Sequence, residues 1–118
     1  TTAFQGIYVV EHLKGTEPLL RTGDLITIGY VAHALNGERF DDTYKAGTPL
    51  SFRLGDPGQV IRGLEIGLRK LGRGGKAMFI IPSQYAFGAE GSAAGIVPPF
   101  TTVVYELEVL GREEPVLP

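Results

Sequence analysis

One segment of the chain has the periodicity of an α-helix. Its apolar side chains recur at spacings of three, four and three residues, on one helix face, at Ile61, Leu64, Leu68 and Leu71. Gly63 and Gly67 interrupt this segment, although a glycine inside a helix costs about 1 kcal/mol relative to alanine. The close approach of a backbone or a ligand is the usual reason for such glycines. The sequence therefore predicts one short helix with a close neighbour.

The other apolar segments have the patterns of strands. We expect strands at residues 7–10, 24–35, 38–43, 50–54, 76–81 and 101–110. Asn36-Gly37 is a strong signal for a hairpin between two of them. Residues 76–81 are apolar on both faces, as in a central strand. One helix against about five mainly antiparallel strands indicates an α+β fold, in which a curved sheet wraps around the helix.

Length and composition narrow the class of protein. A chain of 118 residues fits one domain with a modest core. We expect this domain at residues 1–111 and a C-terminal tail or linker at residues 112–118. A formal net charge of −2 argues against a nucleic-acid partner, and no apolar run reaches the roughly 18 residues of a membrane span. The lack of cysteine excludes disulfides, thiolate metal sites and cysteine nucleophiles.

The polar residues form no familiar catalytic pattern. His12 and His33 have no metal-ligand spacing to another His, Asp or Glu, and the serines lie outside any nucleophile motif. Asp41 and Asp42 are neighbours in a predicted strand, so their side chains should face opposite ways and not act together. Asp41 is expected to point inward, with a structural hydrogen-bonding role as the alternative. What remains is an apolar site without a metal or a strong acid–base pair.

Prolyl isomerisation is a reaction that needs only such a site. Rotation about an Xaa-Pro bond breaks amide resonance, which gives a barrier of about 18–20 kcal/mol. Water stabilises the planar ground state by solvating the amide dipole, and the twisted transition state has less of that dipole. A dry aromatic pocket therefore favours the twisted state. One or two hydrogen bonds to hold the peptide complete the requirement.

Several short motifs together carry a resemblance to a known family. They are Gly23-Asp24, Arg39-Phe40-Asp41, Phe52-Arg53-Leu54-Gly55, Val60-Ile61-Arg62-Gly63, Tyr85-Ala86-Phe87-Gly88 and Ile96-Val97-Pro98-Pro99. Each is weak alone, but their order and spacing, from about Gly6 to Gly111, resemble the FKBP peptidyl-prolyl cis-trans isomerases. The resemblance implies an FKBP-like fold, isomerase activity without cofactor or metal, and proline-containing polypeptides as partners. It also implies binding of macrolides such as rapamycin.

The resemblance also implies a pocket. Its catalytic positions are expected to be Tyr30, Phe40, Asp41, Val60, Ile61, Leu64, Phe87, Ile96 and Tyr105, and its substrate-binding positions Leu50 and Val97. Asp41 matches the family's buried aspartate. The backbone N–H of Ile61 matches the donor to a ligand carbonyl, and Ile96-Val97 matches an exposed hydrophobic lip. On the helix pattern alone, Ile61 and Leu64 fit equally well as plain core residues.

Four of these positions depart from the family pattern. The pocket floor, commonly Trp, is Leu64, and a loop Tyr whose hydroxyl reaches the ligand is Phe87. Leu50 and Tyr105 stand where Phe is common. The pocket loses area beneath the proline ring and one hydrogen bond, worth about 0.5–1.5 kcal/mol. We expect weak macrolide binding and reduced isomerase activity. A weakly active or non-catalytic module that binds a peptide or partner is the alternative.

The sequence does not determine the compartment, the client proteins or the oligomeric state. The chain starts at Thr1 rather than Met, which is typical of a processed or excised piece. A chain without cysteine fits the cytoplasm and also an oxidising compartment. With the resemblance to stand-alone bacterial members, these features favour a bacterial cell envelope or periplasm, with the cytoplasm as the alternative.

Overall fold

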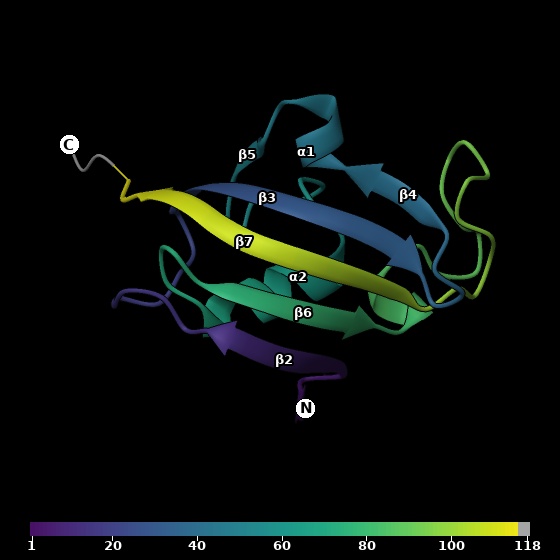
Figure 1. Ribbon diagram of the computed structural model, residues 1–118, viewed down its shortest axis with the longest axis horizontal. Helices are drawn as coiled ribbons and strands as arrows, with labels where there is room; N and C mark the ends of the chain where they lie inside the picture. The colour runs from purple at the N-terminus through teal and green to yellow at the C-terminus, as the bar shows by residue number, and fades with distance from the viewer. Residues whose placement is uncertain (116–118) are drawn as a thin grey trace.

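The computed structural model describes residues 1–115 of the chain. Its strands form one curved antiparallel sheet, and the short helix α2 (Arg62–Gly67) lies against one face of that sheet (Figure 1). A 3-10 turn, Leu68–Lys70, continues the helix. The apolar side of α2 and the apolar side of the sheet bury each other, which is why the two layers pack. The predicted α+β fold is confirmed.

The sheet contains seven strands within the described residues, against about five predicted. They are β1 (Thr2–Phe4), β2 (Ile7–Leu13), β3 (Leu25–Ala34), β4 (Arg39–Asp42), β5 (Leu50–Arg53), β6 (Lys76–Ile81) and β7 (Val103–Glu113). Their order is β1-β2-β6-β7-β3-β4, and β5 also pairs with β3. Because β7 takes one edge of β3 over its whole length, β4 and β5 share the other edge.

Two short elements, the strand β1 and the helix α1 (Thr43–Ala46), differ from the sequence prediction. β1 was missed because it has only three residues, and it pairs with β2 through a turn at Gln5 and Gly6. The helix α1 takes the place of the last residue of a predicted strand. It begins where the Asp42 carboxylate accepts hydrogen bonds from the N–H groups of Tyr44 and Lys45. Aspartate is a preferred N-cap residue, but the sequence pattern places Asp42 in a strand, so this helix was not predicted.

The two glycines of α2 lie where the helix approaches the sheet. A Cβ atom on Gly63 would be 2.5 Å from Cγ2 of Ile81, and one on Gly67 would be 2.9 Å from Cε1 of Phe79. Both distances are too short for non-bonded carbon atoms. The predicted close neighbour is therefore present, but it consists of side chains of β6 rather than the backbone or ligand that was expected.

Gly63→Ala is expected to lower the free energy of unfolding by about 1–3 kcal/mol, because the added methyl group overpacks the contact with Ile81. This outcome opposes the gain of about 1 kcal/mol that alanine gives in an unobstructed helix. Urea unfolding measures the difference. Gly111→Ala is the matched control, since its Cβ would lie 3.7 Å from Cβ of Thr27, an ordinary contact. A Gly63→Ala protein as stable as the parent would contradict the packing argument.

β7 extends further than the sequence predicted. Its expected end was Leu110, but the strand continues to Glu113 and reaches the fully buried Asp24. Nε of Arg112 donates to Oδ2 of Asp24 at 2.7 Å, and the N–H of Arg21 donates to the same oxygen at 3.0 Å. The segment predicted as a tail, 112–118, thus begins inside the sheet, and residues 116–118 of it lie outside the described residues.

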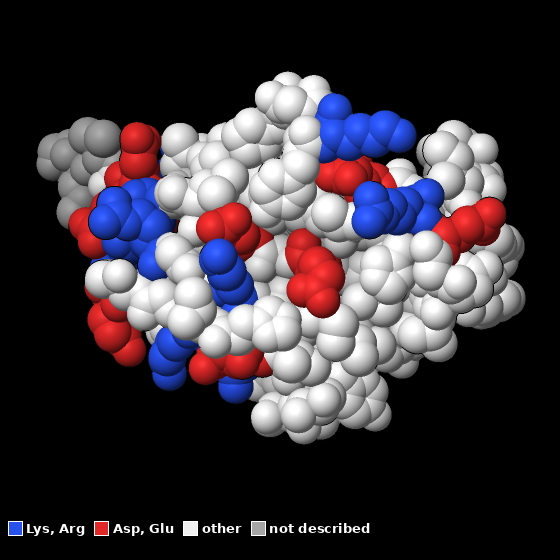
Figure 2. Space-filling view, in the orientation of Figure 1, with Lys and Arg blue, Asp and Glu red and all other residues white. Residues whose placement is uncertain are grey.

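The outer face of the sheet, opposite α2, carries mixed charge. Figure 2 shows acidic and basic side chains interspersed on this face. Ion pairs link strands there. His12 Nε2 of β2 lies 3.5 Å from Glu106 Oε2 of β7, across the intervening β6, and Lys76 Nζ of β6 lies 3.8 Å from Glu108 Oε2 of the adjacent β7. Within residues 1–115 no helix is long and apolar enough to cross a membrane. The same residues contain no group of three or more His, Cys, Asp or Glu side chains that could hold a metal ion.

Candidate functional site

Four aromatic side chains from separate parts of the chain meet in one cluster. Tyr30 of β3 lies 5.1 Å from Tyr105 of β7, between ring centroids. Phe40 of β4 points its ring edge-on toward Tyr105 at 6.1 Å and toward Phe87 at 5.8 Å. These distances are in the range of favourable aromatic pairs. All four residues were predicted pocket positions. The sheet brings three of them together, and Phe87 joins them from the loop between β6 and β7.

A β-bulge in β4 gives Phe40 its place in this cluster. Ala32 pairs with Asp41, whereas the next residue, His33, pairs with Arg39, so Phe40 has no partner on β3. An extra residue of this kind bends the strand and re-aims its side chains. In a regular strand Phe40 and Asp41 would face opposite ways. Here Phe40 contacts Tyr105 and Asp41 contacts Tyr30, so both reach the same cluster.

Asp41 is bonded to the cluster but is not buried. The Tyr30 hydroxyl donates to Oδ2 of Asp41 at 2.5 Å, while the Asp41 residue as a whole is exposed. The expectation of a buried aspartate is therefore wrong, because Asp41 lies at the rim and reaches inward with one oxygen. Asp42 points elsewhere and caps α1, as the opposite-facing prediction required. The Tyr30–Asp41 hydrogen bond fixes the Tyr30 ring beside Tyr105.

Burial raises the pKa of both tyrosines in the cluster. For Tyr30 the loss of water around the phenolate is the main cause, and the hydrogen bond to Asp41 adds to it. For Tyr105 burial is again the main cause, followed by the negative charge of Asp41. Each hydroxyl therefore stays protonated in the folded protein at a pH where an ordinary tyrosine has ionised.

The stability of the protein is expected to fall as the pH rises above about 10, the pKa of tyrosine in an unfolded chain. Since the unfolded state releases the Tyr30 and Tyr105 protons first, their contribution is complete below that pH and is lost above it. Urea unfolding at pH 8 to 11 tests this. Tyr30→Phe and Tyr105→Phe should each reduce the alkaline loss, and unaltered pH curves in both variants would show that other groups cause it.

The start of α2 combines apolar side chains with a backbone amide that has no acceptor among residues 1–115. Leu64 is buried in the core, and the partly buried Val60 and Ile61 pack against the same core cluster. Ile61 is the N-cap residue of α2, and its carbonyl accepts from the N–H of Leu64. Within residues 1–115 the N–H of Ile61 donates to no protein acceptor. An unpaired amide beside apolar side chains can bind a peptide carbonyl.

The two predicted lip residues differ in exposure. Ile96 is 64% exposed, whereas Val97 is 2% exposed and belongs to the core. The N–H of Val97 donates to Oγ of Ser92, and its carbonyl accepts from the N–H of Ser92. These bonds hold Val97 inward, so the expected exposed pair is wrong for Val97. Leu50 of β5 is half-buried against the core and does not line either of the hollows described next.

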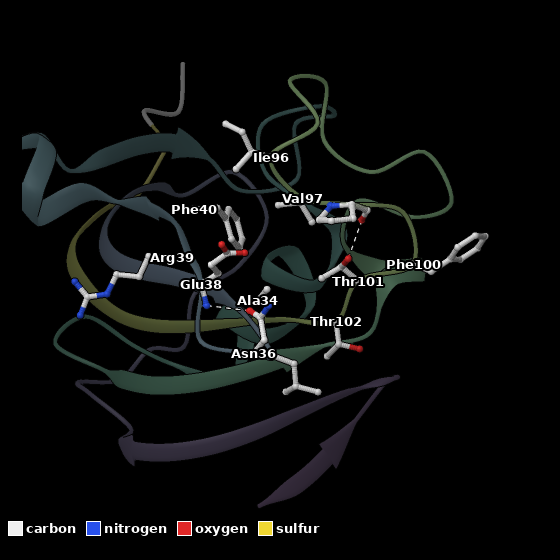
Figure 3. A pocket seen from close by; sticks show the side chains of 12 residues that line it. Ala34, Asn36, Glu38, Arg39, Phe40, Ile96, Val97, Phe100, Thr101 and Thr102 are labelled. Carbon is white, nitrogen blue, oxygen red and sulfur yellow. Dashed lines mark hydrogen bonds between the residues drawn. The ribbon is translucent and has the colours of Figure 1, made fainter.

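Two hollows flank Phe40. The hairpin hollow, about 510 Å³, lies between the turn of the β3–β4 hairpin and segment 96–102, with Asn36, Glu38, Phe40, Ile96, Pro98 and Thr102 in its lining (Figure 3). The α1 hollow, about 530 Å³, is bounded by β4, α1 and Ile96. Sequence reasoning found Phe40, Asp41, Ile96 and Val97 among these lining residues. It predicted the hairpin turn at Asn36-Gly37 but not its place beside the site, because polar turn residues look alike whether or not they border a site.

The fold and the site together define a class of protein: a sheet curved around a short helix, with an aromatic cluster that packs in the same core as that helix. A family model described as FKBP-type peptidyl-prolyl cis-trans isomerase matches residues 17–110. The chain belongs to the FKBP-type peptidyl-prolyl cis-trans isomerase family. Catalysis of Xaa-Pro rotation is the activity of this family.

Relatives and a solved structure agree with this assignment. FK506-binding protein 1 of Saccharomyces cerevisiae is 42% identical over 90 residues, 76% of this chain and 77% of that protein. The isomerase FkpA of Escherichia coli K12 is 37% identical over 102 residues, 86% of this chain and 35% of FkpA. The match to the crystal structure of FkpA covers 97% of this chain and 51% of the FkpA chain, with a TM-score of 0.86 and 31% sequence identity.

Proposed function

We propose that the aromatic cluster around Phe40 is the site at which this chain isomerises Xaa-Pro bonds. The observation that carries the proposal is the position of the Ile61 amide, unpaired within the described residues, at the start of the helix whose Leu64 packs in one core with Tyr30 and Tyr105. A proline ring stacked there would lie on Leu64 between aromatic walls. The Ile61 N–H would hold a substrate carbonyl, and the exposed Ile96 would contact the Xaa side chain.

The mechanism follows from the chemistry of that environment. No side chain needs to attack the substrate or transfer a proton to it. The rings of Tyr30, Phe40, Phe87 and Tyr105 exclude water from the amide and so remove the solvation that favours its planar form. The Tyr30–Asp41 hydrogen bond keeps one wall in place and keeps the Tyr30 hydroxyl protonated. Catalysis is then mainly positioning and desolvation of the bond that rotates.

NMR exchange spectroscopy on short Xaa-Pro peptides tests the site directly. The protein should raise the cis–trans exchange rate above background, with apolar Xaa favoured by Ile96. Phe40→Ala should lower kcat/KM about tenfold or more, since loss of one aromatic wall removes 1.4 kcal/mol or more of transition-state stabilisation. Leu13→Ala, at an exposed apolar side chain of β2, is the control. Exchange at the uncatalysed rate with every peptide would overturn the proposal.

A second function, a weakly active or non-catalytic module that binds peptides, is favoured by two residues of the site. Leu64 offers less flat area than a Trp floor, and Phe87 lacks a hydroxyl to donate. The double variant Leu64→Trp/Phe87→Tyr discriminates between the two functions. If isomerase activity appears only in this variant, the natural chain is a binding module. If the parent already accelerates exchange, the enzyme is established and the variant measures how much activity the replacements cost.

Macrolide binding is proposed to be weak for the same reasons. Calorimetry with rapamycin should give a lower affinity for the parent chain than for Phe87→Tyr. The gain expected from the restored hydroxyl is about two- to tenfold, from a hydrogen bond worth about 0.5–1.5 kcal/mol. Equal affinities would show that the Phe87 position does not reach the ligand.

A bacterial cell envelope or periplasm is the compartment we propose. The similarity to Escherichia coli FkpA over 86% of the chain and the lack of cysteine support it. Osmotic shock of cells that express the full-length gene, followed by blotting of the released fraction, tests this proposal. Recovery of the protein only with the cytoplasmic fraction would favour the alternative.

A further inference from the structure

The hairpin hollow has an apolar side and an acidic side. Phe40, Ile96 and Pro98 contribute apolar surface, and Glu38 contributes the carboxylate. In Figure 3 the side chains of Glu38 and Phe40 rise from the same hairpin, and Ile96 and Val97 lie across from them. Thr101, on the far side, uses its hydroxyl to donate to the carbonyl of Pro98 at 2.8 Å. The hollow therefore combines a surface for aliphatic carbon with one anionic group.

The charge of this hollow is set by Glu38. Arg39 also borders it, but its side chain leads away in Figure 3, and its guanidinium lies 3.6 Å from the Asp42 carboxylate. Among residues 1–115, Glu38 takes part in no ion pair, unlike Asp24, Asp42, Glu106 and Glu108. Its backbone N–H is bonded to Oδ1 of Asn36 at 3.0 Å, which fixes the turn from which the side chain projects. A cation entering the hollow would meet a carboxylate without a competing partner.

The hollow and the aromatic cluster share Phe40. Phe40 lines the hollow and also makes the edge contacts with Phe87 and Tyr105. Ile96, which would contact the Xaa side chain, borders it as well. An extended peptide advances about 3.3–3.6 Å per residue. A residue one or two positions from the Xaa-Pro pair would therefore place its side chain in the hollow.

We infer that the hairpin hollow is a subsite for a basic side chain, lysine or arginine, of a substrate residue that flanks the Xaa-Pro pair. The aliphatic stem of such a side chain packs on Phe40 and Ile96 while its charged end approaches Glu38. Long basic side chains combine apolar stems with charged ends in this way. The subsite rests on the proposed function, because the peptide must first bind at the aromatic cluster. It adds a preference for position and charge that the cluster alone does not have.

The test compares peptides that differ only in one flanking residue. In one set of peptides lysine stands either directly before or directly after the Xaa-Pro pair, and in a second set norleucine, which has a similar side chain without the charge, replaces it. The value of kcat/KM for each peptide is measured by NMR exchange. At one position or more, lysine should be preferred about threefold, the effect of an exposed ion pair. The preference should be lost in Glu38→Gln and reversed toward norleucine in Glu38→Lys, where the two like charges repel. It should also weaken at 1 M salt, where charges are screened beyond about 3 Å.

Glu11→Gln is the matched control, because it removes one exposed carboxylate from β2 and changes net charge equally. Its lysine preference should equal that of the parent. Equal rates for lysine and norleucine at all positions would overturn the subsite and leave the isomerase intact. A lysine preference that survives Glu38→Gln, or that Glu11→Gln also removes, would overturn it too. Absence of catalysis with every peptide would instead overturn the proposed function.

Discussion

Asp24→Ala is expected to lower the free energy of unfolding by about 3 kcal/mol, because it removes the buried carboxylate that pairs with Arg112 and accepts two hydrogen bonds. Asp24 is fully buried, and its Oδ2 accepts from both Arg112 Nε and the Arg21 N–H. The substitution removes the acceptor of the Arg21 N–H and leaves Arg112 with its remaining partner Glu114, whose Oε1 lies 3.2 Å from Nη2. Urea unfolding followed by circular dichroism gives the difference.

Two further variants separate charge from packing at Asp24. Asp56→Ala removes an exposed aspartate from a turn and should change stability by less than about 0.5 kcal/mol. Arg112→Met should destabilise the protein because it leaves the Asp24 carboxylate buried and unpaired. Combining Asp24→Leu with Arg112→Met should recover much of that loss, since apolar replacements of a buried pair are often tolerated. A small effect of Asp24→Ala would show that the pair is not needed to join β7 to the rest of the sheet.

Leu64→Ala is expected to cost about 2–5 kcal/mol of stability and to reduce isomerase activity in molecules that remain folded. Leu64 is 2% exposed and packs in the core cluster with Tyr30 and Tyr105. Removing its methyl groups loses burial and leaves a cavity. The same cavity would lie under the proposed proline ring, so the substrate would lose its floor.

Leu64→Met provides the comparison for this prediction. It keeps the volume and should cost less than about 1.5 kcal/mol. Activity should be measured at a temperature where unfolding curves show each variant to be folded. If Leu64→Ala lowers stability but leaves kcat/KM unchanged, Leu64 is a plain core residue, the reading that the helix pattern alone allowed.

Much of the fold was predictable because strands and helices impose local periods. The apolar spacing at Ile61, Leu64 and Leu68 located α2, and the glycines within it correctly indicated a close neighbour. The long strand before Asn36-Gly37 and the central strand at 76–81 were also correct. These features depend on residues a few positions apart, which a sequence displays directly. A strand as short as β1 has too few residues to show a period, so the sequence pattern did not predict it.

For the site, the sequence predicted which residues take part but not how they are arranged. The motif resemblance named Tyr30, Phe40, Phe87 and Tyr105, and the structure brings their rings into contact. It did not show that a bulge would turn Phe40 and Asp41 toward the same cluster. A bulge depends on how two strands pair, so neither strand reveals it alone. The inward turn of Val97 similarly depends on its bonds to Ser92.

The sequence by itself determined the layers of this protein, the family to which it belongs and the types of side chain at its site. Only the tertiary structure decided that Arg112 meets Asp24, that Val97 is buried beside an exposed Ile96, and that Glu38 borders a hollow next to Phe40. The physical reason is the range of the interactions. Periodicity and turn chemistry act between near neighbours, whereas ion pairs, bulges and hollows arise where distant segments pack together.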